Sequence, residues 1–440
     1  MKHRVPSRWV LTYAAAAILA GCGVLRQAQD DMPPPIGAPR AMPQTSPSYS
    51  YKVLLAFGSA PRSHSRGRHP QTGLLNVNGT LYGTTNRGGG SGDGTVFSIS
   101  TDGTEKVLHH FRGGSDGAHP NADLIDVNGT LYGTTASGGS SGCYPSDDGC
   151  GTVFSITTSG IEKVLHAFTG GCKSCPDGDF PSGSLIHVNG TLYGMTGGGG
   201  GLYKSLYNCC GTFYSVSLTG KEKVLFRFAK NDGFYPNGSP VAVGDLLYST
   251  TYSGGTFGKG TVFSITTTGK EKVIYSFAGG SDGEYPFTGL TDVNGTLYGT
   301  TSGPDPITYG SNPHCKGGCG TIFSLSVSGE EKVLHVFKGG SEGALPNADL
   351  ANVSGVLYGT TEYGGGGNCQ SEYGKGCGTV FQITTAGLES VLHRFSGADD
   401  GAAPLADLIG VNGTLYGTTS RGGNNGCLGE GCGTVFELTP

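Results

Sequence analysis

One short phrase recurs seven times along this chain and constrains the fold more than any other feature. The phrase is Leu-Tyr-Gly-Thr-Thr or a near copy, and successive copies lie 50 to 61 residues apart. Its tyrosines are Tyr82, Tyr132, Tyr193, Tyr248, Tyr298, Tyr358 and Tyr416. Self-similarity at such a period is the signature of a repeat architecture. We therefore expect one large repeat domain rather than several unrelated domains.

Each repeat reads as four antiparallel strands joined by short loops. In the second repeat, the segments rich in alternating apolar, β-branched and aromatic residues predict the strands. These segments are residues 122–127, 130–135, 151–157 and 162–168. Asn128-Gly129 separates the first two, and this pair favours a type I′ hairpin turn because both central residues of that turn need φ > 0.

Seven sets of four strands predict an all-β fold, a seven-bladed β-propeller of four-stranded antiparallel blades. The repeats begin with a fourth-type strand, residues 52–57, and end after a third-type strand, residues 433–438. One blade therefore needs both ends of the chain. We expect these two strands to pair and close the ring, which removes exposed sheet edges. The alternative is an open, linear solenoid.

The full repeat resembles a known family. Val-Asn-Gly-Thr-Leu-Tyr-Gly-Thr-Thr is followed by Gly-Thr-Val-Phe-Ser-Ile and Glu-Lys-Val-Leu-His-x-Phe. This phrase resembles the GloVer tandem repeat of secreted bacterial proteins that use a choice of surface anchors, and the strand order resembles kelch-type propellers. The resemblance covers residues 51–440 and implies surface attachment. It implies no catalytic residues, because the family has no assigned activity.

The first 50 residues are expected to lie outside the propeller. Residues 1–21 have a basic start and a short apolar stretch, as in a secretory signal. The signal ends in Leu-Ala-Gly before Cys22, which resembles a bacterial lipobox and implies lipidation of that cysteine; the alternative is an ordinary signal peptide. Residues 22–50 are proline-rich and read as a tether. We expect an exported protein anchored to the bacterial envelope, at the outer membrane, with the lipid as its only membrane contact.

Composition excludes some functions. Charged residues make up 14% of the chain and no basic patch occurs, so we expect no nucleic-acid partner. The sequence contains no nucleophile elbow, zinc-protease helix or phosphate loop. Four histidines hold one repeat position on the fourth strand, and we interpret them as structural. They are His109, His166, His335 and His393.

Thirteen cysteines remain to be explained, and twelve are left once Cys22 is set aside. An even number in an exported protein predicts disulfides. Four local pairs are expected: Cys143–Cys150, Cys315–Cys319, Cys369–Cys377 and Cys427–Cys432. The third repeat carries Cys172, Cys175, Cys209 and Cys210, which form either disulfides of undetermined order or a zinc site.

Two sets of carboxylates are candidates for chemistry. Acidic residues precede glycine in the loop before each first strand, which indicates a turn or, at Asp116, Asp282 and Asp400, a calcium site. We expect no cofactor, with calcium at these loops as the alternative. Asp123, Asp349 and Asp407 share a position at the start of the innermost strand, so they should rim the central channel. They either bond to neighbouring blade loops or form an acid/base pair.

Tyrosines gather in the loops between the second and third strands. They are Tyr144, Tyr203, Tyr207, Tyr309, Tyr363 and Tyr373. Exposed tyrosines suit sugar or peptide surfaces, although these could instead pack the loops together. Our leading hypothesis is a monomeric binding or scaffold module for a glycan or an envelope protein, rather than an enzyme. The alternatives are a carbohydrate hydrolase or lyase that uses the rim carboxylates, and a purely structural envelope protein.

Overall fold

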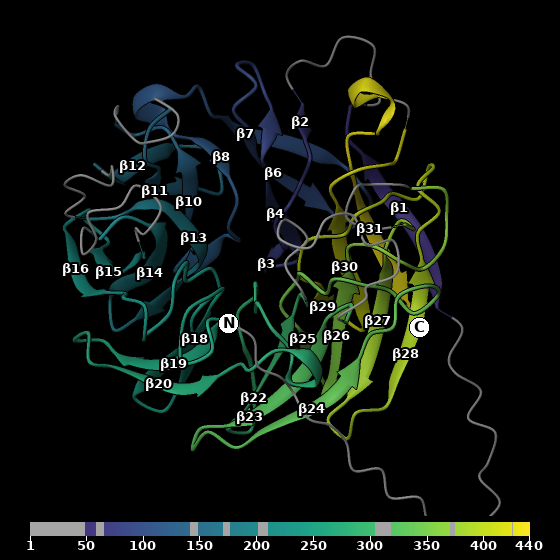
Figure 1. The fold of residues 1–440 in the computed structure, drawn as a ribbon. Helices are drawn as coiled ribbons and strands as arrows, with labels where there is room; N and C mark the ends of the chain where they lie inside the picture. The colour runs from purple at the N-terminus through teal and green to yellow at the C-terminus, as the bar shows by residue number, and fades with distance from the viewer. Residues whose placement is uncertain are drawn as a thin grey trace, which may run out of the picture. The chain divides into compact units, whose positions relative to one another are not determined.

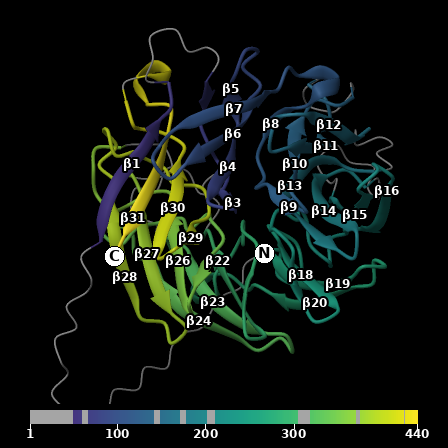
Figure 2. The same cartoon turned by 180° about the vertical axis from the view of Figure 1, so that it is seen from behind.

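The chain folds into seven antiparallel sheets arranged as the blades of a propeller (Figures 1 and 2). The structure is a computed structural model that describes residues 49–58, 66–140, 148–169, 177–200, 210–303, 318–369, 375–424 and 426–440. The predicted signal, Cys22 and nearly all of the tether lie outside these residues. Among the residues described, no helix has the length and apolar character needed to span a bilayer.

Each of the first four blades follows the predicted strand order. Blade 1 consists of β3 (Leu75–Val77), β4 (Thr80–Thr85), β6 (Thr95–Ser100) and β7 (Glu105–His110). Blade 2 consists of β9 (Ile125–Val127), β10 (Thr130–Ser137), β11 (Thr152–Thr157) and β12 (Glu162–Ala167), with β8 (Ala118–Pro120) also on β10. Blade 3 consists of β13 (Asp179–Val188), β14 (Thr191–Gly198), β15 (Thr212–Ser217) and β16 (Glu222–Arg227). Blade 4 consists of β17 (Val241–Val243), β18 (Leu246–Thr251), β19 (Thr261–Thr266) and β20 (Glu271–Ser276).

The remaining blades repeat this order. Blade 5 consists of β21 (Thr291–Val293), β22 (Thr296–Thr301), β23 (Thr321–Ser326) and β24 (Glu331–Val336). Blade 6 consists of β25 (Ala351–Val353), β26 (Val356–Thr361), β27 (Thr379–Thr384) and β28 (Glu389–Arg394). Blade 7 takes β29 (Ile409–Val411), β30 (Thr414–Thr419) and β31 (Thr434–Thr439) from the C-terminus and β1 (Ser50–Ala56) from the N-terminus.

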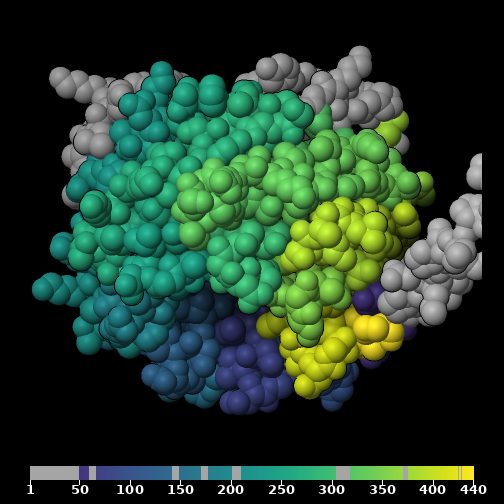
Figure 3. All heavy atoms as spheres, turned by 90° about the horizontal axis from the view of Figure 1, so that it is seen from below, coloured from purple at the N-terminus to yellow at the C-terminus, as the bar shows by residue number. Residues whose placement is uncertain are grey.

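The ring closes between the two ends of the described chain, as the sequence predicts. Strands β1 and β31 are antiparallel neighbours, with Ser50 opposite Thr439 and Ala56 opposite Thr434. Figure 1 shows the purple β1 beside the yellow β31, and the space-filling view of Figure 3 shows purple and yellow residues in contact. The alternative of an open solenoid is therefore excluded.

An aromatic pair fills each of the seven blade junctions. A ring that follows the fourth strand meets, edge to face, a ring on the third strand of the next blade, with centroids 5.0 to 5.5 Å apart. The pairs are Phe57–Phe97, Phe111–Phe154, Phe168–Tyr214, Phe228–Phe263, Phe277–Phe323, Phe337–Phe381 and Phe395–Phe436. All these rings are buried, so they remove large apolar areas from water and favour this geometry.

A glycine and a proline make a second contact at every junction. The glycine before the third strand has no Cβ, and a Cβ there would lie 2.4 to 2.7 Å from the proline Cδ of the next blade. At the closing junction, the pair is Gly433 and Pro70, and the N–H of His69 donates to the carbonyl of Cys432 at 2.8 Å. The recurring Gly-Thr of the sequence thus reflects close packing between blades.

In blade 2, for example, the first strand is shorter than predicted. Residues 122–127 were expected to be a strand, but β9 spans only Ile125–Val127. The reason is that the N–H of Asp123 donates to a side chain of the next blade rather than to its own sheet. The predicted hairpin turn is present, with φ of 54° at Asn128 and 82° at Gly129.

Candidate functional site at the channel rim

One residue from each blade forms a ladder of hydrogen bonds around the inner end of the sheets. The seven equivalent positions are Gly73, Asp123, Ser184, Ser239, Gly289, Asp349 and Asp407. Where the residue has a polar side chain, that side chain accepts from the backbone N–H of the preceding blade's equivalent residue. The five bonds are Gly73 to Asp123 (2.6 Å), Asp123 to Ser184 (3.0 Å), Ser184 to Ser239 (3.1 Å), Gly289 to Asp349 (2.5 Å) and Asp349 to Asp407 (2.9 Å).

Two ladder positions are glycines, and the space left by the missing side chain lets the ladder residues of the two flanking blades meet. A Cβ at Gly73 would lie 3.3 Å both from the Asp123 carboxylate and from Asp407 Cβ, and Asp407 shares a hydrogen bond with Asp123 across this gap. Asp349 likewise bonds to the side chain of Ser239 across Gly289. The structure therefore brings all three predicted rim aspartates into one network.

Burial and nearby negative charge raise the pKa of two of these carboxyl groups, Asp349 and Asp407. Removal from water raises the pKa of Asp349 to about 7, and the neighbouring Asp123 charge adds to the shift. Removal from water also raises the pKa of Asp407 well above its usual range, with further contributions from Asp349 and Asp123. At neutral pH the network can therefore hold protons on carboxyl groups and present both donors and acceptors.

The network forms one wall of a cavity of about 180 Å³. Side chains two positions before the ladder residues contribute most of its remaining polar lining, notably Asn121, Asn237 and Asn347. Phe287 holds the same repeat position and is 48% exposed. Its ring stands at 89° to that of Tyr252, with centroids 5.9 Å apart, which supports it from one side.

Sequence reasoning missed these amides and Phe287. A usable signal was present, because every residue concerned follows the proline that precedes a first strand. These residues stand two positions before Asp123 and its equivalents in the repeat.

The structure describes only one of the predicted ligand-binding tyrosines, Tyr363. Tyr363 is only 7% exposed, so the prediction of an exposed ring is wrong at this position. An antiparallel bridge to Ala344 holds its backbone, and its side chain joins a hydrophobic cluster that includes Leu350. The other candidates, Tyr144, Tyr203, Tyr207, Tyr309 and Tyr373, lie outside the described residues.

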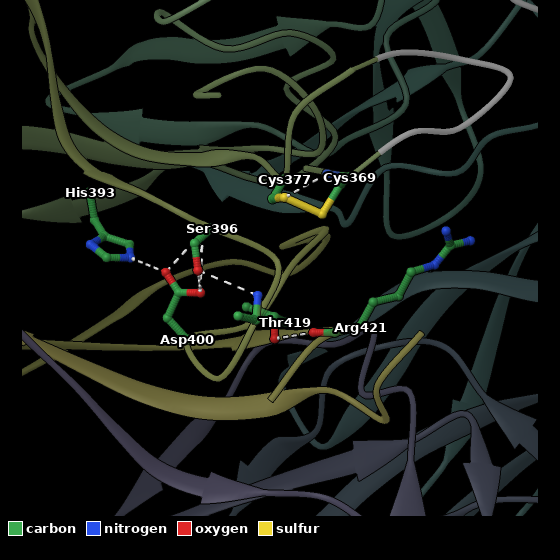
Figure 4. The surroundings of a disulfide bond; sticks show 8 residues. Cys369, Cys377, His393, Ser396, Asp400, Thr419 and Arg421 are labelled. Atoms are coloured by element: carbon green, nitrogen blue, oxygen red, sulfur yellow. Dashed lines mark hydrogen bonds and ion pairs between the residues drawn. A yellow bond between two sulfur atoms is a disulfide. The ribbon is translucent and has the colours of Figure 1, made fainter. Parts of the chain in front are cut away.

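Tyr363 also lines a second cavity, of about 250 Å³, beside the disulfide between Cys369 and Cys377. Figure 4 shows this disulfide near Arg421, which contributes to the same cavity. The predicted bond between Cys427 and Cys432 is also present. Cys150 and Cys319 are disulfide-bonded, while their predicted partners, Cys143 and Cys315, lie outside the described residues, as do Cys172, Cys175 and Cys209.

The acidic loop residues are oriented by backbone donors. The N–H of Arg112 donates to Asp116 at 2.8 Å, that of Ala278 to Asp282 at 2.5 Å and that of Ser396 to Asp400 at 2.9 Å. Figure 4 shows the last of these loops, where His393 also approaches Asp400, at 3.4 Å. These bonds are the expected turn chemistry. Calcium at these loops stays a prediction.

Solved structures resemble this chain at low identity. The N-terminal domain of Nup159 is 11% identical over 90% of this chain and 97% of its own, with a TM-score of 0.45. The PQQ-bound aldose sugar dehydrogenase from Streptomyces coelicolor is 11% identical over 89% and 98%, with a TM-score of 0.42. A europium-containing methanol dehydrogenase is 10% identical over 89% and 93%, with a TM-score of 0.44. At this degree of likeness, their activities say nothing about this chain.

No curated protein matches the sequence. The profile of the Gloeobacter/Verrucomicrobia repeat, in contrast, matches in three consecutive segments, residues 44–145, 144–312 and 308–440. These segments span every blade. The chain therefore belongs to the Gloeobacter/Verrucomicrobia repeat family.

Proposed function

We propose that this protein is a non-enzymatic binding module that holds a glycan in the cavity at the channel rim. The observation that carries the proposal is the lining of that cavity. It combines amide side chains, carboxyl groups that can donate or accept, and the half-exposed ring of Phe287. Amides and carboxyls match sugar hydroxyl groups, and an aromatic ring offers a flat apolar contact at low entropic cost.

The competing function is a carbohydrate hydrolase or lyase that uses the rim carboxylates. A raised carboxyl pKa beside a second carboxylate favours it, since an acid and a base would then coexist. The geometry favours binding. Asp407 and Asp123 meet across Gly73, where a Cβ would lie 3.3 Å from each, whereas a hydrolytic pair stands about 5 to 10 Å apart around the scissile bond. One oxygen of each aspartate also accepts a backbone N–H, which fixes its position.

The proposal includes the location of the protein. A signal segment, a lipidated Cys22 and a proline-rich tether would place the propeller outside the cytoplasm on the bacterial envelope, as expected from the sequence. The disulfides of the outer loops suit an oxidising compartment. A glycan ligand at the cell surface or in the periplasm is consistent with that setting.

A glycan array probed with the purified protein tests the proposal, once with calcium and once with chelator. The affinity for any glycan that binds is then measured for Phe287→Ala and for the matched control Phe257→Ala. Phe257 is 59% exposed but does not line the cavity. We expect Phe287→Ala to weaken binding about tenfold and Phe257→Ala to leave it unchanged.

If both variants lost affinity equally, or neither lost any, the glycan would not bind in this cavity. An array without any specific glycan would overturn the glycan proposal in favour of a protein partner or a structural role. Loss of binding with chelator would identify the acidic loops as metal sites. Hydrolysis of an array glycan would support the enzyme instead.

A further inference from the structure

A second set of titratable side chains recurs at the blade junctions, on the outer part of the sheets. Each set combines a residue of the fourth strand, the acidic residue of the following loop and a glutamate from the fourth strand of the next blade. At two junctions these are His109, Asp116 and Glu162, and His335, Glu342 and Glu389. In each of these, one ligand atom from every residue lies within 4.8 Å of the other two.

Both junctions contain buried polar atoms without a hydrogen-bond partner among the described residues. Oε1 of Glu162 and Oε1 of Glu389 are two of them, and the same atom is unpaired at the equivalent glutamates of other junctions, Glu105, Glu222, Glu271 and Glu331. Nε2 of His335 is a third, although Oε1 of Glu342 lies only 3.1 Å away. The two groups are therefore close without being aligned for a hydrogen bond. Leaving such atoms unpaired is costly unless something else satisfies them.

The distances match those between atoms that share one metal ion. Zinc binds histidine nitrogen and carboxylate oxygen at about 2.0 to 2.2 Å, so tetrahedral neighbours lie roughly 3.3 Å apart. The corresponding contacts are a hydrogen bond of 3.2 Å between His109 Nε2 and Asp116 Oδ1, which a bound ion would replace, and a contact of 3.1 Å between His335 Nε2 and Glu342 Oε1. Co-ligands point at the ion and not at each other, which explains the poor alignment at His335.

The loop carboxylates are also held as metal ligands usually are. The N–H of Arg112 donates to Oδ2 of Asp116, and the N–H of Lys338 donates to Oε2 of Glu342. At Glu342 this bond leaves Oε1 facing His335, and at Asp116 both oxygens lie within 3.3 Å of His109 Nε2. Such supporting hydrogen bonds orient the ligands of known metal sites.

The junction of blades 2 and 3 carries the same three residue types, His166, Asp177 and Glu222, but their ligand atoms do not form a group within 4.8 Å. Two further junctions lack the histidine and serve as natural controls. Phe226 and Tyr275 stand where His109 and His335 do. At the junction of blades 6 and 7 Tyr51 replaces the glutamate, and its ring stacks on His393 with centroids 3.9 Å apart. The fold therefore does not require the complete set.

We propose that the junctions at His109 and His335 each bind one divalent transition-metal ion of the zinc class. One imidazole nitrogen and two carboxylate oxygens would supply three ligands, and water the remaining position. The imidazole distinguishes these sites from calcium sites, which use oxygen ligands. Each ion would join two consecutive blades. The proposal does not depend on the ligand of the channel cavity.

Equilibrium dialysis of the purified, oxidised full chain against Zn²⁺, with metal analysis, tests the proposal. His109→Phe and His335→Phe reproduce the aromatic residues found at other junctions, so the propeller should tolerate them; circular dichroism and thermal melting check this. His166→Phe is the matched control, because Asp177 beside it is already bonded by the N–H and hydroxyl of Thr169.

We expect the wild type to hold two more zinc ions than the double variant, each single variant to lose one and His166→Phe to lose none. Zinc should also raise the melting temperature of the wild type but not of the double variant, because an ion that binds only the folded state stabilises it. Glu389→Gln should weaken zinc binding by at least about tenfold. An equal zinc content in the wild type and the folded double variant would overturn the proposal, whatever metal the cysteines bind.

Discussion

The backbone N–H of Asp349 donates a hydrogen bond of 2.9 Å to the carboxylate of Asp407 in the next blade. Asp407 in turn bonds to Asp123 across the gap left by Gly73. One side chain therefore links three blades at the channel rim. It fixes the backbone of one neighbour and meets the carboxylate of the other, so its structural and electrostatic roles can be separated by substitution.

Asp407→Asn keeps an acceptor for the Asp349 N–H but removes a charge. Because the folded-state pKa of Asp407 is raised, the wild type loses stability as the pH rises through that range. We expect the Asn variant to be at least as stable as the wild type at about pH 8. Asp407→Ala leaves the Asp349 N–H without an acceptor and should lower the free energy of unfolding by about 1 to 3 kcal/mol. Urea unfolding measures both, and equal destabilisation by Asn and Ala would contradict the hydrogen-bond role.

Two junction glutamates should make stability depend on pH. Removal from water raises the pKa of Glu271 and of Glu331 to about 7, with contributions from Asp232 and Asp282 respectively. A raised folded-state pKa gives stability that is complete below the unfolded value, about 4.5, and is lost as the pH rises to about 7. The double variant Glu271→Gln and Glu331→Gln should lose less stability across this window than the wild type.

Thermal melting between about pH 4.5 and 8 measures this difference. Glu330→Gln is the control, because it removes an exposed carboxylate next to Glu331. Parallel pH profiles for the wild type and the double variant would show that these glutamates keep ordinary pKa values in the fold.

The sequence predicted the number of blades, their strand order and their closure because these follow from local patterns repeated seven times. The Asn128-Gly129 turn is an example, since its conformation depends only on its own residues. Side chains that meet between blades were harder to predict. Glu162 reads as an ordinary strand residue, and only the packing of consecutive blades places it beside Asp116 of the preceding blade. Phe287 likewise becomes part of a cavity only when all blades are in place.

Tyr214→Phe should stabilise the protein. The Tyr214 ring is fully buried at the junction with blade 2, and its hydroxyl has no hydrogen-bond partner among the described residues. Burial raises the pKa of this hydroxyl, so the group stays protonated and still lacks an acceptor. Equivalent positions carry Phe154 and Phe263, which pack in the same way. We expect a gain of about 1 to 2 kcal/mol in urea unfolding, and a loss would show that the hydroxyl is satisfied.

Ring closure can be tested with two glycines of blade 7. Gly433 has φ of +94°, and a Cβ there would lie 2.3 Å from the Thr419 carbonyl oxygen and 2.6 Å from Pro70 Cδ. Gly413 has φ of +84°, but a Cβ there would meet nothing within 4 Å. Both alanine variants incur backbone strain of about 1 to 2 kcal/mol, and Gly433→Ala adds overpacking of about 1 to 3 kcal/mol at the junction that joins the two ends of the chain.

Gly413→Ala therefore serves as the control for backbone strain, and the difference between the two variants reports on the junction. We expect Gly433→Ala to lower the free energy of unfolding clearly more than Gly413→Ala in urea titrations. It should also expose Phe57, which packs on Phe97 across the same junction, so limited proteolysis should release the N-terminal strand first. Equal destabilisation with an uncut N-terminal strand would show that the contact between Gly433 and Pro70 does not hold the ring closed.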